Sequence, residues 1–146
     1  MFVVYDELVG KEPVEWNYLL HTVELPMEVA EEKDGLRILG KNKADGVSIA
    51  HLFSSQKMTY AQTDTFFVAA VDWKKRLGKT LSNHYHFTAT TASCSKICFL
   101  NVIDVHGNNR ADAVINRERN RITVEEWVIE CNLEGEGNAF LYIENK

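Results

Sequence analysis

The sequence predicts an all-β protein, an antiparallel β-sandwich of about ten short strands with one long irregular loop near residues 63–83. Apolar runs of strand length recur roughly every ten residues along the chain. The segments between these runs are rich in glycine, aspartate, asparagine and charged residues, which suit exposed turns. No segment sustains the 3.6-residue period of a long amphipathic helix.

The first half of the chain begins with two apolar runs flanking residues 9–12, whose glycine and charges suit a turn, so an opening hairpin is expected. Asp34-Gly35 is a strong signal for a second hairpin. Val47, Ile49, His51 and Phe53 alternate onto one face of a later strand. The strands predicted in this half cover residues 3–8, 13–22, 23–26, 27–30, 36–40, 47–53 and 58–62.

The second half opens with residues 63–83, which lack a clear period and are expected to form a long loop, either functional or packed on itself. The run at residues 96–105 is apolar almost throughout, as in a strand covered on both faces. The other strands predicted here cover residues 85–90, 113–116, 121–131 and 139–143. The core candidates are the large apolar side chains of these runs: Trp16, Tyr18, Leu20, Phe99, Trp127 and Ile143.

Length and charge are those of one folded domain spanning residues 1–146. Residues 1–50 hold ten acidic and five basic side chains, and residues 51–146 hold eleven of each, so the net charge of −5 belongs to the first third. This balance argues against a nucleic-acid partner, which would require a broad basic face. No apolar run approaches the ~20 residues of a membrane span, so no membrane partner is expected. The first residues also lack the features of a signal peptide.

Three cysteines, Cys94, Cys98 and Cys131, are an odd number and lack the spacing of a metal site. Three free, buried thiols are the expected arrangement. A disulfide from Cys94 to Cys131 or Cys98 stays open if Cys94 lies in a turn.

The amino-acid sequence of the opening stretch also shows a family resemblance. "VYDEL" at residues 4–8, followed by "PVEWNYLLHT" at residues 13–22, resembles the heparinase II/III-like polysaccharide lyases. Weaker similarities follow in the same order: "NHYHFTATTAS" before "KICFLNVIDVH", and "EEWVIECNL" before "NAFLYIEN". In that family these phrases lie in the β-sandwich region towards the C-terminus, downstream of the catalytic machinery.

The resemblance implies a fragment or truncated homologue of a larger bacterial lyase that cleaves uronic-acid polysaccharides, such as glycosaminoglycans, by β-elimination. The family works in the periplasm or outside the cell, and its sandwich packs on a helical catalytic domain that this chain lacks. The family's Gly-His-x-His/Ala-Asp type phrase, which carries a catalytic histidine and metal ligands, has no match in residues 1–146. We therefore assign no catalytic residue and expect no cofactor.

Some histidines and carboxylates still merit a functional reading beside a structural one. His84 and His86 are two apart and share a strand face, so they are weak candidates for metal ligands, although a surface pair or a core histidine is the commoner arrangement. Asp6, Glu7 and His21 would form an acid/base set if they faced one another across the opening hairpin. Ordinary strand-end residues are the alternative.

Two basic clusters are candidate binding sites for an acidic polysaccharide. The first joins an aromatic ring to positive charge at Trp73, Lys74 and Arg76. The second is Arg117, Arg119 and Arg121 beside a hairpin tip, where the three side chains would converge on an anion. Solvated surface charge is the alternative for both clusters.

The sequence therefore predicts a non-catalytic C-terminal β-sandwich domain of a heparinase II/III-like lyase that supports the catalytic region and contacts polysaccharide. An independent carbohydrate-binding module is the main alternative, and a small metal-dependent β-barrel enzyme using His84 and His86 is a weaker one. Residues 2–5 lack proline, lysine and inward charge, so we expect them to form an unguarded edge strand, which would be open to self-association.

Overall fold

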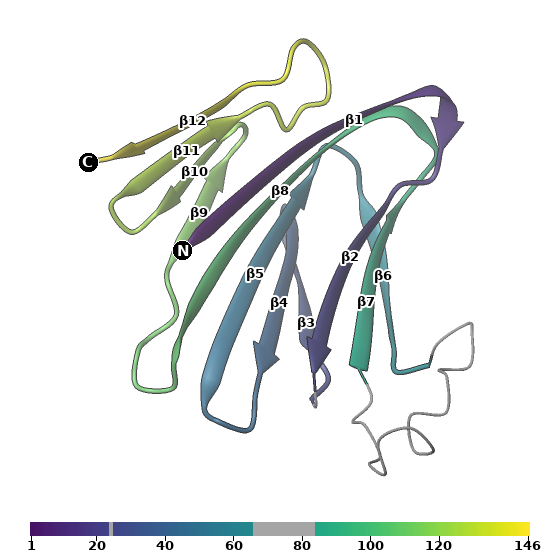
Figure 1. Ribbon diagram of the computed structural model, residues 1–146. Helices are drawn as coiled ribbons and strands as arrows, with labels where there is room; N and C mark the ends of the chain where they lie inside the picture. The colour runs from purple at the N-terminus through teal and green to yellow at the C-terminus, as the bar shows by residue number, and fades with distance from the viewer. Residues whose placement is uncertain (24, 66–83) are drawn as a thin grey trace, which may run out of the picture.

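The computed structural model describes residues 1–23, 25–65 and 84–146 (Figure 1). These residues form twelve strands: β1 (Phe2–Val14), β2 (Asn17–Val23), β3 (Glu28–Glu32), β4 (Gly35–Lys41), β5 (Gly46–Ser54), β6 (Met58–Thr63), β7 (His84–Thr91), β8 (Cys94–Gly107), β9 (Ile115–Glu118), β10 (Arg121–Val124), β11 (Trp127–Cys131) and β12 (Leu141–Asn145). Most of residues 63–83, including the candidates Trp73, Lys74 and Arg76, lie outside the described residues. Within the described part no helix is long and apolar enough to cross a membrane.

The strands form three antiparallel sheets packed in layers (Figure 1). The central sheet has the order β1-β8-β5-β4-β3, and it lies between a three-stranded sheet, β2-β7-β6, and a four-stranded sheet, β12-β11-β10-β9. The predicted antiparallel sandwich is confirmed, with twelve strands in place of about ten.

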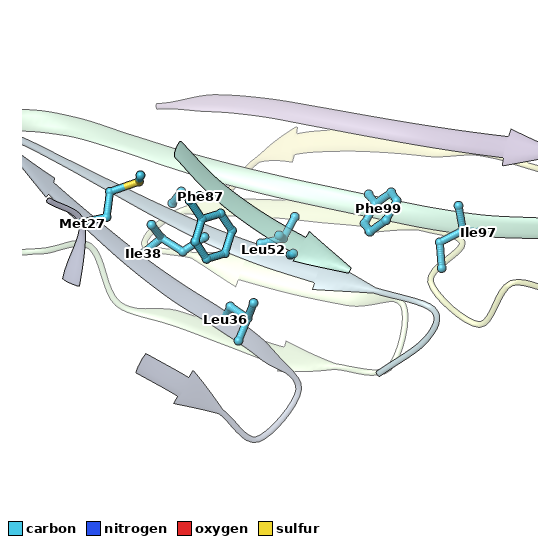
Figure 2. Packing of buried hydrophobic residues seen from close by; sticks show 9 residues of the cluster. Met27, Leu36, Ile38, Leu52, Phe87, Ile97 and Phe99 are labelled. Atoms are coloured by element: carbon cyan, nitrogen blue, oxygen red, sulfur yellow. The ribbon is translucent and has the colours of Figure 1, made fainter. Parts of the chain in front are cut away.

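The first core fills the space between the central sheet and the three-stranded sheet (Figure 2). Leu36, Ile38 and Leu52 of the central sheet meet Phe87 of β7, and all four are at most 4 % exposed. Burying a side chain of this size contributes about 1.5–3 kcal/mol each. Trp16, Tyr18 and Leu20 of the linking segment and β2 pack partly buried against the same cluster.

The second core lies on the opposite face of the central sheet, against the four-stranded sheet. Leu100 and Val102 of β8 meet Ile122 and Ile129, and none of the four is exposed. Ile97 and Phe99 of the same strand belong to the first core, because successive side chains of a strand point to opposite faces. The predicted cover on both faces is therefore confirmed for residues 97–104, whereas Val105 is 53 % exposed.

The predicted opening hairpin is wrong. Residues 9–12 belong to β1, which pairs with β8 through Phe2–Val9, while β2 crosses to another sheet and pairs with β7. The register between β1 and β8 shifts between Val9 and Val14, so the strand bulges where its composition suggests a turn. At Gly10 a Cβ would lie 2.9 Å from the main-chain oxygen of Glu12, so the bulge requires glycine.

Two strands and one core residue also differ from what the sequence predicts. The single strand expected at residues 121–131 is a hairpin of β10 and β11, turning at Glu125 with a φ of 52°. Of the strand expected at residues 23–26, Val23 is the last residue of β2, and residues 25 and 26 are not in a strand. Ile143, expected in the core, is 41 % exposed on β12, at an edge of the four-stranded sheet.

Candidate functional site

A cavity of about 550 Å³ lies between the β3–β4 turn and the β5–β6 turn. Its walls are Glu31, Glu32, Lys33, Asp34, Gly35, Leu36, Ser54, Ser55, Gln56, Lys57, Met58, Arg117 and Leu133. Of the sequence candidates that lie among the described residues, only Arg117 is found in its walls.

Close contacts with neighbouring strands fix the position of the two turns. Asp34-Gly35 forms the predicted β3–β4 turn, and a Cβ at Gly35 would lie 2.4 Å from the carbonyl oxygen of Leu52, so only glycine lets β4 begin this close to β5. On the other wall, Ser55 donates its N–H to the carbonyl of Cys98 and accepts the Cys98 N–H on Oγ, both at 3.0 Å. The β5–β6 turn is thereby tied to β8.

Arg117 on β9 reaches from the four-stranded sheet to the β3–β4 turn. Its Nη1 donates to the main-chain oxygen of Asp34 at 2.8 Å, and its Nε donates to that of Arg119 at 2.9 Å. The guanidinium carbon lies 5.3 Å from the ring centroid of Phe53, a cation–π contact. Burial lowers the pKa of Arg117 below its ordinary value, although the guanidinium remains a cation.

The other two arginines of the cluster do not join Arg117. Arg117 lies opposite Ile122 and shares its inward face, whereas Arg121 lies opposite Glu118 and Glu130 on the outward face. Arg121 Nη1 forms a 3.1 Å ion pair with Glu130. Arg119 is exposed in the hairpin turn with a φ of 53°. The predicted convergence of the three side chains is therefore wrong.

The charges around the cavity balance. Lys33, Lys57 and Arg117 supply three positive charges, and Glu31, Glu32 and Asp34 supply three negative ones. Glu32 also extends behind the cavity, where its Oε2 lies 3.4 Å from Nδ1 of the buried His51. Burial lowers the pKa of His51, which favours the neutral imidazole.

A network of charged and polar side chains continues from His51 along the same face of the central sheet. Arg37, which lies opposite His51 in the β4–β5 register, pairs with Asp112 at 2.6 Å. Nε2 of His106 lies 3.5 Å from Asp112 and 3.9 Å from the buried Asp104, which in turn lies 3.3 Å from Nη1 of Arg110. These contacts hold residues 107–114 against the central sheet.

This network is not predicted from the sequence. Arg37, His51 and Asp104 are polar side chains inside otherwise apolar strand patterns, and that interruption was the available signal. Their partners Arg110 and Asp112 lie in a loop, and sequence spacing does not pair them with the strands.

His84 and His86 lie on β7 as predicted, on the face turned away from the core residue Phe87. His86 faces His21 across the β2–β7 pair, with ring centroids 4.6 Å apart at 78°. Within the described ranges no group of three or more His, Cys, Asp or Glu side chains is placed to hold a metal ion. The described strands form open sheets rather than the closed barrel of the weaker alternative.

The suggested acid/base set is not assembled. Glu7 pairs with Lys96 at 2.8 Å on the central sheet, whereas His21 belongs to the three-stranded sheet. Asp6 lies on the other face of β1 from Glu7, because the two are successive residues of one strand.

The three cysteines are free, as expected. Cys98 and Cys131 are buried, whereas Cys94 is half-buried. The hydroxyl of Tyr5 lies 3.6 Å from the Cys98 sulfur and donates to the carbonyl of Asn132 at 3.0 Å. Burial raises the pKa of Cys98, and it raises that of Cys131 to about 11. Both thiols are therefore poor nucleophiles at neutral pH.

In comparisons with known proteins, the chain matches no protein-family model and has no significant match among curated protein sequences.

Proposed function

We propose that this chain is the C-terminal β-sandwich domain of a heparinase II/III-like polysaccharide lyase, non-catalytic by itself. It supports the β region that packs on the helical catalytic domain, and it contacts acidic polysaccharide. On this proposal the parent lyase works in the periplasm or outside the cell. The ordered motifs of the sequence and the all-β architecture support the assignment.

The observation that carries the proposal is the free edge of β1, the strand that holds the "VYDEL" motif. In the described part of the chain β1 pairs only with β8 and leaves its other side open. Phe2, Val4 and Leu8 lie on one face of this edge and are 62 %, 39 % and 37 % exposed. Apolar residues along an open strand edge suit a further packing partner.

A second apolar strip lies at β12, which forms an edge of the four-stranded sheet. Phe140, Leu141, Tyr142 and Ile143 are 41–53 % exposed there. Two exposed apolar edges are what a supporting domain would present to the rest of a larger enzyme.

The environments of Tyr5 and Tyr18 favour a non-catalytic role for these two side chains. β-Elimination requires a base that removes the proton α to the carboxylate, and a tyrosine base requires a lowered pKa. Burial instead raises the pKa of Tyr5 and of Tyr18 above the ordinary value of 10. The Tyr5 hydroxyl is already engaged with the carbonyl of Asn132.

The test combines this chain with the helical domain of a heparinase II/III-like lyase expressed without its own C-terminal sandwich. We expect co-elution on size exclusion and a gain of lyase activity, measured by the ultraviolet absorbance of unsaturated uronate products from heparin, heparan sulfate or alginate. The chain alone should give no turnover. Val4→Lys should weaken the complex, whereas Val114→Lys, at a more exposed valine outside the strands, should not.

Turnover by the isolated chain would contradict the proposal, as would a helical domain that neither binds the chain nor gains activity from it. An independent carbohydrate-binding module is the second candidate. The cavity beside Arg117 favours it, because a module has to hold sugar without a partner domain. Sugar binding together with failure to bind the helical domain would select the module.

A further inference from the structure

Arg117 lines the cavity of about 550 Å³ between the β3–β4 and β5–β6 turns. Its Nε and Nη1 are bonded to main-chain oxygens, and Nη2 has no hydrogen-bond partner among the described residues. The same residues contain no carboxylate within ion-pair distance of the guanidinium. The two main-chain bonds and the Phe53 ring hold the guanidinium in place, so its free donor is oriented before a ligand arrives.

The rest of the cavity wall suits a hydroxyl-bearing ring. Oγ of Ser55 accepts the Cys98 N–H and Oγ of Ser54 accepts the Gln56 N–H, so each hydroxyl keeps its own proton to donate. The carboxylates of Glu31 and Asp34 can accept hydrogen bonds from ligand hydroxyls. Apolar wall residues supply a surface for the C–H face of a ring: Leu36, Met58 and Leu133.

The charge balance limits the class of ligand. Three cations and three carboxylates around the cavity cancel, and the whole chain carries a net charge of −5. Such a site exerts no long-range attraction on a polyanion. The volume of about 550 Å³ lies within the usual range for small-ligand pockets, roughly 300–1,000 Å³.

We propose that this cavity binds the terminal uronic-acid residue of a short acidic saccharide, with the sugar carboxylate on Nη2 of Arg117. The inference deepens the polysaccharide contact of the proposed function and rests on it. It selects chain ends and short products over internal stretches of a sulfated polymer.

The test uses digalacturonic acid as probe, galactobiose as its neutral counterpart and heparin as the polyanion, with affinity measured by titration calorimetry. Digalacturonic acid should bind more tightly than either comparison ligand. Arg117→Gln should weaken its binding about tenfold to a hundredfold, the usual range for a charge-assisted hydrogen bond. Arg121→Gln is the matched control and should leave binding unchanged, because Arg121 lies on the outward face and pairs with Glu130.

Arg117 also links two sheets, so the folding of Arg117→Gln is checked by its thermal melt. Independently of that variant, digalacturonic acid added to the wild-type chain should shift the backbone amide resonances of residues 54–57 and 117. Equal affinity for the neutral disaccharide, tighter binding of heparin, unchanged binding by folded Arg117→Gln, or resonance shifts absent or confined to other strands would each overturn the proposal. Docking to the helical domain is measured without saccharide, so a failure of the proposed function is distinguishable from a failure of this inference.

Discussion

Nδ2 of Asn101 donates a 3.1 Å hydrogen bond to the hydroxyl of Tyr18, joining the central sheet to the three-stranded sheet inside the first core. Asn101 is fully buried, and Tyr18 packs its ring 5.4 Å from that of Phe99. A buried amide with a single side-chain partner makes the pair sensitive to loss of either group.

Tyr18→Phe should lower the free energy of unfolding by about 1–3 kcal/mol, because the Asn101 amide is left buried without its acceptor. The double variant Tyr18→Phe/Asn101→Leu should recover part of this loss, because it removes both the buried donor and its acceptor. Urea unfolding of the four proteins of this cycle measures the coupling. Unchanged stability of Tyr18→Phe would show that the hydrogen bond contributes nothing.

Stability should fall as the pH drops below 6.5, in part because of His51. Burial lowers the pKa of His51, so the unfolded chain binds a proton more readily than the folded chain does. The stability that the neutral imidazole of His51 contributes is complete above pH 6.5 and is lost as the pH falls towards its folded-state pKa. The neighbouring Glu32 and Asp112 raise this pKa and so oppose the effect of burial, whereas Arg37 lowers it further. His51→Gln should lose less stability than wild type between pH 7.5 and about 5.5, measured by urea unfolding.

The control for that experiment is His84→Gln, because His84 is exposed on β7. This variant should keep the pH dependence of the wild-type chain. An identical pH dependence in His51→Gln would rule out His51 as its source.

One of the three thiols should react with Ellman's reagent well before the others. Cys94 is half-buried, whereas Cys98 and Cys131 are buried with raised pKa values. Cys94→Ser should remove the fast phase at pH 8, and denaturant should release the slow thiols of the wild-type chain. A fast phase that persists in Cys94→Ser would mean that a buried thiol is accessible.

Self-association through β1 should depend on Val4. Among the described strands, residues 2–5 lie on an edge strand, as predicted. Val3 packs partly buried against the second core, so the substitution Val3→Lys would disturb folding and does not test the edge. Val4 is 39 % exposed, and Val4→Lys should reduce any oligomer seen by light scattering at rising concentration while changing stability by about 0.5 kcal/mol or less. Val114→Lys is the matched control, and equal oligomerisation of both variants would exclude the edge.

The fold was predictable where local pattern and tertiary environment agree. Asp34-Gly35 gives a turn, and the apolar run of β8 gives a strand covered on both faces. Residues 9–12 have the composition of a turn yet continue β1, because pairing with a strand about ninety residues later outweighs a local preference. Glu125 turns a hairpin in a left-handed conformation that glycine or asparagine would have signalled.

The candidate site was predictable only through Arg117. Its charge and its place beside a hairpin were visible in the sequence, but its surroundings come from distant strands. Phe53 and the serines of the β5–β6 turn lie about sixty residues before it, and Asp34 lies 83 residues before it. The inward direction of Arg117 and the outward direction of Arg121 depend on the register of β9 with β10, which spacing alone does not fix.

The order of strands in the central sheet has a consequence for synthesis on the ribosome. Among the described strands β1 is made first, but its only partner there is β8, which ends at Gly107. At about 5–20 residues per second, β1 waits roughly 5–20 s for this partner. The edge of β1 that β8 covers in the finished domain lacks that cover in the nascent chain, and this interval is when aggregation or chaperone capture competes most with folding.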